Sequence, residues 1–146
     1  MTTNLAIPVG VSGQSTLIVG DEHTATRVGS GRIRVLATPV MINVIEAAAL
    51  AACEALLPEG QQSLGTHLNI SHIAATPVGM KIVARATVVR VEGRKINFAI
   101  EVHDERDLIG EGSHERVVVN VAKFDLRVQE KIQLLTNLNV DKWGVS

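Results

Sequence analysis

The feature that most constrains the fold is a long apolar segment at residues 39–57. It starts after Thr38, an N-cap candidate, with Pro39 at the first helical position, and it stops at the Pro-Glu-Gly sequence of residues 58–60. Between these signals the segment is apolar almost all round. A helix of this kind is buried on most of its sides, so the rest of the chain is expected to wrap around it.

After this helix the sequence changes to an alternation of apolar and polar residues, which is the period of a β-strand. We expect four strands there, with a bulge near residue 89, where the apolar face switches sides. A further strand is expected at residues 24–28, before the helix, and a final helix at residues 123–135. The four strands are expected at residues 63–72, 80–92, 96–102 and 108–121.

This order of one strand, a long buried helix and four antiparallel strands predicts an α+β domain. A curved antiparallel sheet wrapped around a long central helix is the hotdog fold. We expect one domain over residues 1–146, with a loose N-terminal arm at residues 1–20 and a helix at the C-terminal end. Such a sheet leaves an edge strand open, which two copies of the chain can cover, so we expect a homodimer.

Composition argues against several classes of partner. Aromatic residues make up only 2% of the chain, which does not suit the base stacking of single-strand nucleic-acid binders, and the net charge is -1. Polar residues interrupt the longest apolar run, so no membrane span is expected. No basic residue precedes Arg27 to mark a signal peptide, and a single cysteine, Cys53, cannot form an internal disulfide. We expect a cytoplasmic protein without a nucleic-acid or membrane partner.

The histidine and carboxylate pattern does not favour a metal site. His67 and His72 are five residues apart, which places them on opposite faces of a regular strand. Histidines and aspartates also gather at residues 103–114, around a turn where a solvated surface is the commoner arrangement. The chain has no nucleophile elbow, P-loop or dinucleotide-binding glycine motif. We therefore expect neither a metal nor a bound cofactor.

Three polar residues are candidates for chemistry. Glu46 lies inside the apolar helix, where it either has a function or belongs to a thin polar face with Asn43 and Glu54. Thr38 is either a helix N-cap or lies where the N-terminus of a helix stabilises a developing oxyanion. His72 ends an apolar strand and is either structural or a general acid–base group.

A set of motifs with fixed spacing runs from about residue 20 to residue 131. The motifs are Ala37-Thr38, Met41, Glu46, Ser63-Leu64-Gly65-Thr66, SHIAATPVG at 71–79, VEGR at 91–94, His103-Asp104, Ile109-Gly110 and GSHER at 112–116. Together they resemble the fluoroacetyl-CoA thioesterase family, whose members are hotdog proteins that hydrolyse short acyl-CoA thioesters. The common spacing makes this resemblance far more specific than any single motif.

The resemblance implies a catalytic set of a threonine, a helix glutamate and a histidine, which fall on Thr38, Glu46 and His72. The family's glycine beside the thioester carbonyl falls on Gly65, a plausible backbone N–H donor. Its arginine near the acyl group falls on Arg116. The implied substrate is a short-chain acyl-CoA, so coenzyme A enters only as part of the substrate.

One segment departs from the family pattern. The fluoroacetyl-specific enzyme of the family places phenylalanines before its threonine as a lid over the acyl pocket. Residues 31–36 of this chain contain no aromatic residue. We therefore expect an acyl-CoA thioesterase that prefers a different small acyl group.

The sequence leaves the route of hydrolysis open. Glu46 would activate water or take the acyl group itself, while Thr38 would orient Glu46 or attack directly. His72 would protonate the leaving thiolate or shuttle the proton. An alternative function is a non-catalytic hotdog domain that binds acyl-CoA or another apolar ligand. Hydration of an enoyl-CoA is a third possibility, but the Asp/His pair that it usually uses in a different strand–helix context is not found.

Overall fold

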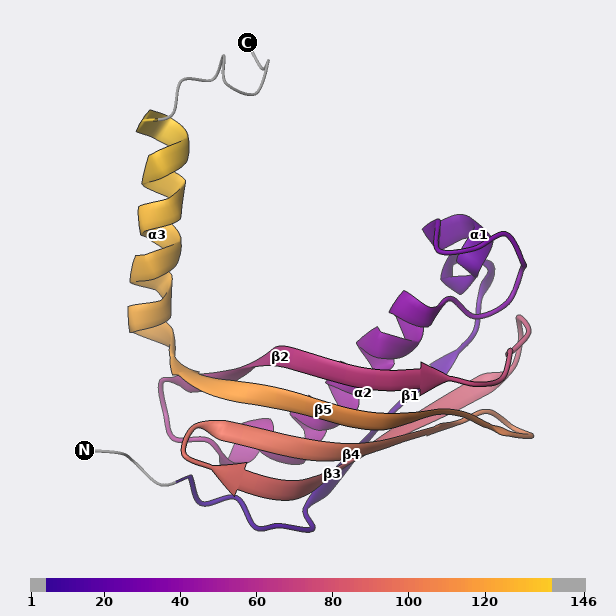
Figure 1. The fold of residues 1–146 in the computed structure, drawn as a ribbon, viewed down its shortest axis with the longest axis horizontal. Helices are drawn as coiled ribbons and strands as arrows, with labels where there is room; N and C mark the ends of the chain where they lie inside the picture. Colours follow the sequence, from indigo (N-terminus) through magenta and orange to yellow (C-terminus); the bar gives the residue numbers. More distant parts are fainter. Residues whose placement is uncertain (1–4, 138–146) are drawn as a thin grey trace.

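The computed structural model describes residues 5–137 and shows an antiparallel five-stranded sheet curled around one long helix (Figure 1). The strand order in the sheet is β1-β3-β4-β5-β2. The strands are β1 (Ser12–Ile18), β2 (Gln61–His72), β3 (Lys81–Glu92), β4 (Lys95–His103) and β5 (Leu108–Asn120). The helices are α1 (Ala25–Val28), α2 (Thr38–Cys53) and α3 (Val121–Asn137), with 3-10 turns η1 (Asp21–His23) and η2 (Glu54–Leu56). This is the predicted hotdog architecture.

The helix α2 packs on the sheet and carries much of the core. Its buried residues include Met41, Ile45 and Ala48, which join Ile82 of β3 and Phe98 of β4 in one apolar cluster. Small residues let the helix and β1 approach closely. A side chain on Gly13 of β1 would collide with the backbone of α2, so only glycine fits at that crossing.

Residues Thr38–Leu56 are long and apolar enough, by length and composition alone, to span a bilayer. The core helix of a globular domain has the same properties, and α2 packs against β1 and β3. The length of this helix is therefore only weak support for a membrane-spanning role.

The N-terminal region differs from the sequence-based expectation. The expected loose arm is wrong for residues 12–18, which form β1 and pair along β3 from Ser12 opposite Thr87 to Ile18 opposite Lys81. The first five residues of β1 (12–16) are small or polar, and Gly13 lies where this edge strand crosses α2, so the apolar alternation that marks a strand is weak. The strand expected at residues 24–28 is also wrong, because this segment forms the single turn α1.

The other elements agree with the prediction to within a few residues at their ends. The bulge expected near residue 89 is confirmed, since the pairing of β3 with β4 shifts register between Val88 and Arg90. A second bulge, which was not predicted, lies in β2 between Gly65 and His67. It sits beside the candidate site described below.

Two elements lie at the margin of the domain. The strand β2 pairs only with β5 within the described chain, so its other edge is open. On β2, Leu64 and Leu68 are 40% and 37% exposed, which is high for apolar residues in a strand of a compact sheet. The helix α3 projects away from the sheet, as Figure 1 shows, with Phe124 and Val128 on its exposed apolar side.

Candidate active site

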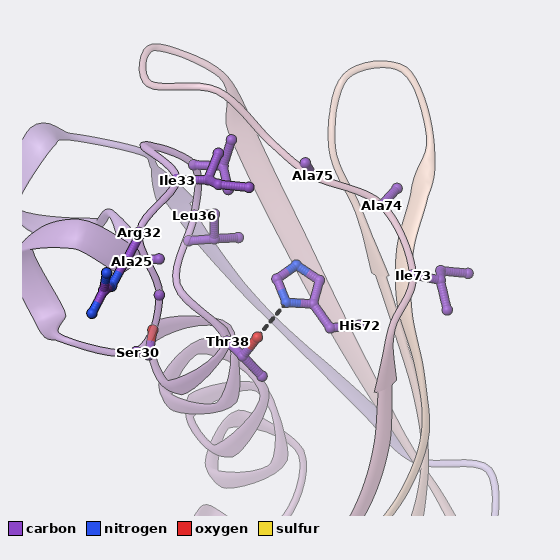
Figure 2. A pocket seen from close by; sticks show the side chains of 12 residues that line it. Ala25, Ser30, Arg32, Ile33, Leu36, Thr38, His72, Ile73, Ala74 and Ala75 are labelled. Atoms are coloured by element: carbon purple, nitrogen blue, oxygen red, sulfur yellow. Dashed lines mark hydrogen bonds between the residues drawn. The ribbon is translucent and has the colours of Figure 1, made fainter.

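The first residue of α2 and the last residue of β2 meet at one end of the domain. The hydroxyl Oγ1 of Thr38 lies 2.7 Å from Nδ1 of His72, and Figure 2 shows this hydrogen bond. The N-cap position of α2 belongs to Ala37, and no side chain caps the helix. The N-cap alternative for Thr38 is therefore wrong, because its hydroxyl forms a hydrogen bond with His72. We call Thr38 and His72 the hydroxyl–imidazole pair.

The other ring nitrogen of His72 is the unusual atom of this pair. Nε2 is buried and forms no hydrogen bond to any residue of the described chain. Burial lowers the pKa of His72 below its ordinary value, and the nearby backbone of Ala74 only partly opposes this effect. The imidazole is therefore neutral near pH 7. A neutral ring with an unbonded nitrogen can exchange a proton with a bound molecule.

A cavity of about 380 Å³ lies beside the pair. In Figure 2 the His72 ring lies between Leu36 on one side and Ala74 on the other. Residues 31–36 form an irregular segment that lies along one wall of the cavity. The lining contains no phenylalanine, tyrosine or tryptophan. Most of it is aliphatic, from Ala25, Ile33, Val35, Leu36, Ile73, Ala74 and Ala75, and its polar members are Ser30, Arg32, Thr38 and His72. Such a cavity suits a small aliphatic group.

A second group of functional side chains lies further along α2, against β2. A Cβ atom added to Gly65 would lie 2.5 Å from Oε2 of Glu46, so this carboxylate packs directly on the glycine. Nη1 of Arg116 donates to the same oxygen over 3.3 Å. The side chain of Glu46 is 37% exposed, whereas that of Arg116 is 5% exposed. We call Glu46, Gly65 and Arg116 the carboxylate group.

Glu46 is thus more than a member of a solvated polar face. Its Oε2 is fixed by Arg116 and Gly65, while Oε1 has no hydrogen-bond partner among residues 5–137. One oxygen of the carboxylate is therefore held, and the other remains available to a bound molecule.

Arg116 is anchored by more than Glu46. Its Nε donates to Oγ of Ser63 over 2.8 Å, and Nη2 donates to the carbonyl oxygen of Ser63 over 3.1 Å. Ser63 in turn donates from both its backbone N–H and its hydroxyl to the two oxygens of Glu54, over 3.0 Å and 2.8 Å. A chain of hydrogen bonds therefore links Glu54 to Glu46 through Ser63 and Arg116.

His114 completes the surroundings of Arg116. Its Nδ1 lies 2.9 Å from the carbonyl oxygen of His67, an atom that can only accept, so Nδ1 carries the hydrogen. Nε2 is then free to accept from Nη1 of Arg116 over 3.2 Å. Burial lowers the pKa of His114, and the Arg116 charge acts in the same direction, whereas the His67 carbonyl and Glu46 oppose it. The ring is neutral and stacks on Phe98.

The two groups are separate within one chain. Thr38 and Glu46 lie eight residues apart on α2, which is roughly 12 Å along the helix axis. The structure thus places the five predicted residues in two separate groups, so Thr38 does not orient Glu46 within one chain. Whether these residues act in catalysis remains a prediction.

Sequence reasoning missed Ser63, Glu54 and His114 as parts of this site. The sequence did carry one signal that His114 belongs to a polar site, because His114 and Arg116 alternate with the apolar Val118 on the same face of their strand. Two polar residues on a core-facing side of a strand require partners inside the domain.

The turn at residues 103–107, considered above for metal binding, is held together by hydrogen bonds to Asp104. Asp104 accepts from the backbone N–H groups of Arg106 and Asp107 and from the hydroxyl of Thr76. Within residues 5–137, no three histidine, cysteine, aspartate or glutamate side chains are placed to hold a metal.

A curled antiparallel sheet around one long helix is the hotdog fold, which is the architecture of the thioesterase structures that this chain resembles. A family model described as fluoroacetyl-CoA-specific thioesterase matches residues 19–122. The chain belongs to this family and is a thioester hydrolase.

Individual relatives agree with this assignment. The fluoroacetyl-CoA thioesterase of Streptantibioticus cattleyicolor is 39% identical over 97 residues, which cover 66% of this chain and 70% of the relative. The solved structure of the fluoroacetyl-CoA thioesterase FlK has a TM-score of 0.81 at 32% identity, and the match covers 86% of this chain and 98% of FlK. A hypothetical protein of Thermus thermophilus, a thioesterase superfamily member, has a TM-score of 0.84 at 26% identity over 90% of this chain and 98% of that protein.

Proposed function

We propose that this protein hydrolyses short-chain acyl-CoA thioesters to the free acid and coenzyme A, at a site that two subunits build together. The observation that carries the proposal is the 2.7 Å contact of Thr38 with His72 beside a small cavity. Nε2 of His72 is buried there without a hydrogen-bond partner among residues 5–137. Variants of the relative FlK have been crystallised with acetyl-CoA and with fluoroacetate and CoA, which supports an acyl-CoA substrate. The alternative of a non-catalytic domain that only binds acyl-CoA does not require a neutral imidazole beside the cavity.

The open edge of β2 supports a homodimer. Antiparallel pairing of β2 with its copy, centred between Leu68 and Asn69, would place the partner's Gly65 opposite His72. The partner subunit's Glu46 would then approach the hydroxyl–imidazole pair. The pair of one subunit and the carboxylate group of the other would form one complete site. The same pairing would help to cover the exposed Leu64 and Leu68 and satisfy the unpaired edge of the strand.

The chemistry assigns a separate task to each residue. The backbone N–H of Gly65 and the N-terminus of α2 stabilise the oxyanion, and the free Oε1 of Glu46 holds the attacking water. Nδ1 of His72 carries the hydrogen and donates it to the hydroxyl of Thr38, so Nε2 is free to act as a base. Nε2 accepts a proton from the water while the water oxygen bonds to the carbonyl carbon of the thioester. The C–S bond then breaks, and the imidazolium returns that proton to the sulfur of coenzyme A.

The acyl group is proposed to be small and aliphatic, because the lining beside His72 is mainly aliphatic and contains no phenylalanine, tyrosine or tryptophan. Without an aromatic lid, we expect little preference for fluoroacetyl over acetyl groups. We also propose a cytoplasmic location, because Cys53 is a free, buried thiol and coenzyme A thioesters are made inside cells.

Subunit complementation tests the proposal. We expect His72→Ala and Glu46→Gln each to lower thiol release from acetyl-, propionyl- and butyryl-CoA by about 100-fold or more. A refolded one-to-one mixture would contain about half heterodimers, each with one intact site, and would recover about a quarter of wild-type activity. A mixture of His72→Ala with Thr38→Ala, in which both changes fall in the hydroxyl–imidazole pair, is the matched control. It should show no more activity than the average of its two components.

The outcomes separate the two parts of the proposal. Wild-type rates in both single variants across the acyl-CoA panel would overturn the catalytic assignment. Inactive single variants that form mixed dimers without recovered activity would overturn the shared site alone.

A further inference from the structure

We propose that Glu54 and Ser63 are positioning residues, which hold Arg116 and, through it, the carboxylate of Glu46. The inference rests on the proposed function, because it assumes that Glu46 takes part in hydrolysis. It adds two residues outside the catalytic set, at the far end of α2 and on β2.

The guanidinium of Arg116 is fixed in orientation by a single residue. Its Nε and Nη2 both bond to Ser63, one to the hydroxyl and one to the carbonyl oxygen. Because the guanidinium is planar, two bonds along one side prevent it from turning. Nη1 then points at Oε2 of Glu46, and the neutral His114 accepts its second hydrogen.

Ser63 is itself fixed by Glu54. Its hydroxyl hydrogen goes to Oε2 of Glu54 and its backbone N–H goes to Oε1. The hydroxyl therefore presents a lone pair, and not its hydrogen, to Nε of Arg116. Without the Glu54 carboxylate, the Ser63 hydroxyl could rotate and leave Nε of Arg116 without an acceptor. An unpaired donor costs free energy here, because Ser63 and Arg116 are each only 4% exposed.

The charges also favour this arrangement. Arg116 is a buried cation, and its direct contact with Glu46 is long at 3.3 Å, with Glu46 partly exposed. Glu54 supplies a second negative charge, and Ser63 lies between it and Arg116. Among the residues that the structure describes, no other carboxylate forms an ion pair or hydrogen bond with Arg116 or Ser63. A buried cation with one weak partner needs this second carboxylate to stay in place.

The network reaches the reaction through a small displacement. If Arg116 moves, Oε2 of Glu46 loses its only hydrogen-bond donor in residues 5–137, and Oε1 moves with it. A misplacement of about 1 Å in a catalytic group can cost on the order of 100-fold in rate. Arg116 and Glu46 would meet only the acyl end of the substrate and not coenzyme A itself, so the loss is expected mainly in kcat and much less in KM.

Steady-state kinetics of the full chain test the proposal with acetyl-CoA as substrate. We expect Glu54→Gln, which preserves shape, and Ser63→Ala each to lower kcat by about tenfold while KM changes by less than about twofold. The double variant should be no slower than Ser63→Ala alone, because both changes interrupt the same chain of contacts. Glu59→Gln is the matched control, since Glu59 is an exposed carboxylate five residues further on, and it should retain wild-type kcat.

Thermal melts followed by circular dichroism establish that each variant is folded at the assay temperature. Should Ser63→Ala fail to fold, the isosteric Glu54→Gln decides the question. A lowered melting temperature with unchanged kcat would reduce the network to a structural role and overturn the proposal, as would a raised KM at constant kcat. If Glu46→Gln itself retains wild-type kcat, the catalytic role of Glu46 has failed and not only its positioning.

Discussion

Gly65 has no room for a side chain because the carboxylate of Glu46 occupies that space. A Cβ atom on Gly65 would lie 2.5 Å from Oε2 of Glu46, 3.1 Å from His114 and 3.4 Å from Arg116. The backbone of Gly65 does not have a positive φ, so a side chain here is opposed by the close approach of the Glu46 carboxylate and not by chain conformation. The strand and the helix thus meet in atomic contact at the centre of the carboxylate group.

Replacement of Gly65 by alanine is expected to displace Glu46 without unfolding the sheet. The atom that must move is the end of the partly exposed Glu46 side chain, so the cost to stability should lie at the low end of the about 1–3 kcal/mol typical of overpacking. The displaced carboxylate should lower kcat for acetyl-CoA by about tenfold or more. Thiol release measured beside a thermal melt separates the two effects. A folded Gly65→Ala enzyme with wild-type kcat would contradict the assigned position of Glu46.

The hydroxyl of Thr38 is expected to act through the ring of His72. Thr38→Val keeps the shape of the side chain but removes the oxygen that bonds to Nδ1, so the ring loses its orientation and kcat should fall by about tenfold or more. Thr38→Ser keeps the hydroxyl and is the matched control, which should retain most of the rate. Equal rates for the two variants would show that the hydrogen bond has no part in catalysis.

The pH dependence of the rate should report the burial of His72. Burial lowers the pKa of His72 below its ordinary value of 6.5, so the ring stays neutral until the solution is more acidic than that. Because only the neutral ring can accept a proton, kcat/KM should be constant near pH 7 and fall on its acid side at a pH below 6.5. A profile of kcat/KM against pH measures this limb. An acid limb above pH 6.5 that disappears in His72→Gln would contradict the prediction.

The architecture was predictable because each later element carries a clear periodic signal. The apolar run of α2 and the alternation of β3, β4 and β5 place their core faces correctly, and the bulge at Val89 follows from a visible switch of face. The first strand was not predictable in the same way. Its small residue Gly13 is dictated by the approach of α2, which is a tertiary contact without a local signature.

The site was predictable only in part. The family resemblance selects Thr38, Glu46 and His72, but it does not reveal that the first and last form a pair while Glu46 stands roughly 12 Å along the helix. That separation depends on the register between α2 and β2. The partnership of Glu54 with Ser63 depends on the same register, so it could not be read from residue spacing.

Stability should also depend on pH through two imidazoles, that of the buried His114 and that of the half-buried His72. Burial lowers the folded-state pKa of both His72 and His114, while the unfolded chain titrates near 6.5. Below pH 6.5 the unfolded state therefore binds more protons than the folded state, so the free energy of unfolding decreases as the solution is acidified. Urea unfolding at about pH 7.5 and pH 5.5 measures this change. His114→Gln should show a smaller decrease between the two pH values, and an unchanged decrease would exclude His114 as a cause.

The size of the acyl group should be set by the aliphatic wall beside His72. Ala74 lines this cavity, and leucine at the same position would fill part of the space without adding a polar group. We expect Ala74→Leu to lower kcat/KM for butyryl-CoA by about tenfold more than for acetyl-CoA, because a longer chain needs the space that leucine takes. Ala99→Leu, a matched change at an exposed position of β4, should leave both values unchanged. An equal effect of Ala74→Leu on both substrates would mean that the acyl chain does not extend past Ala74.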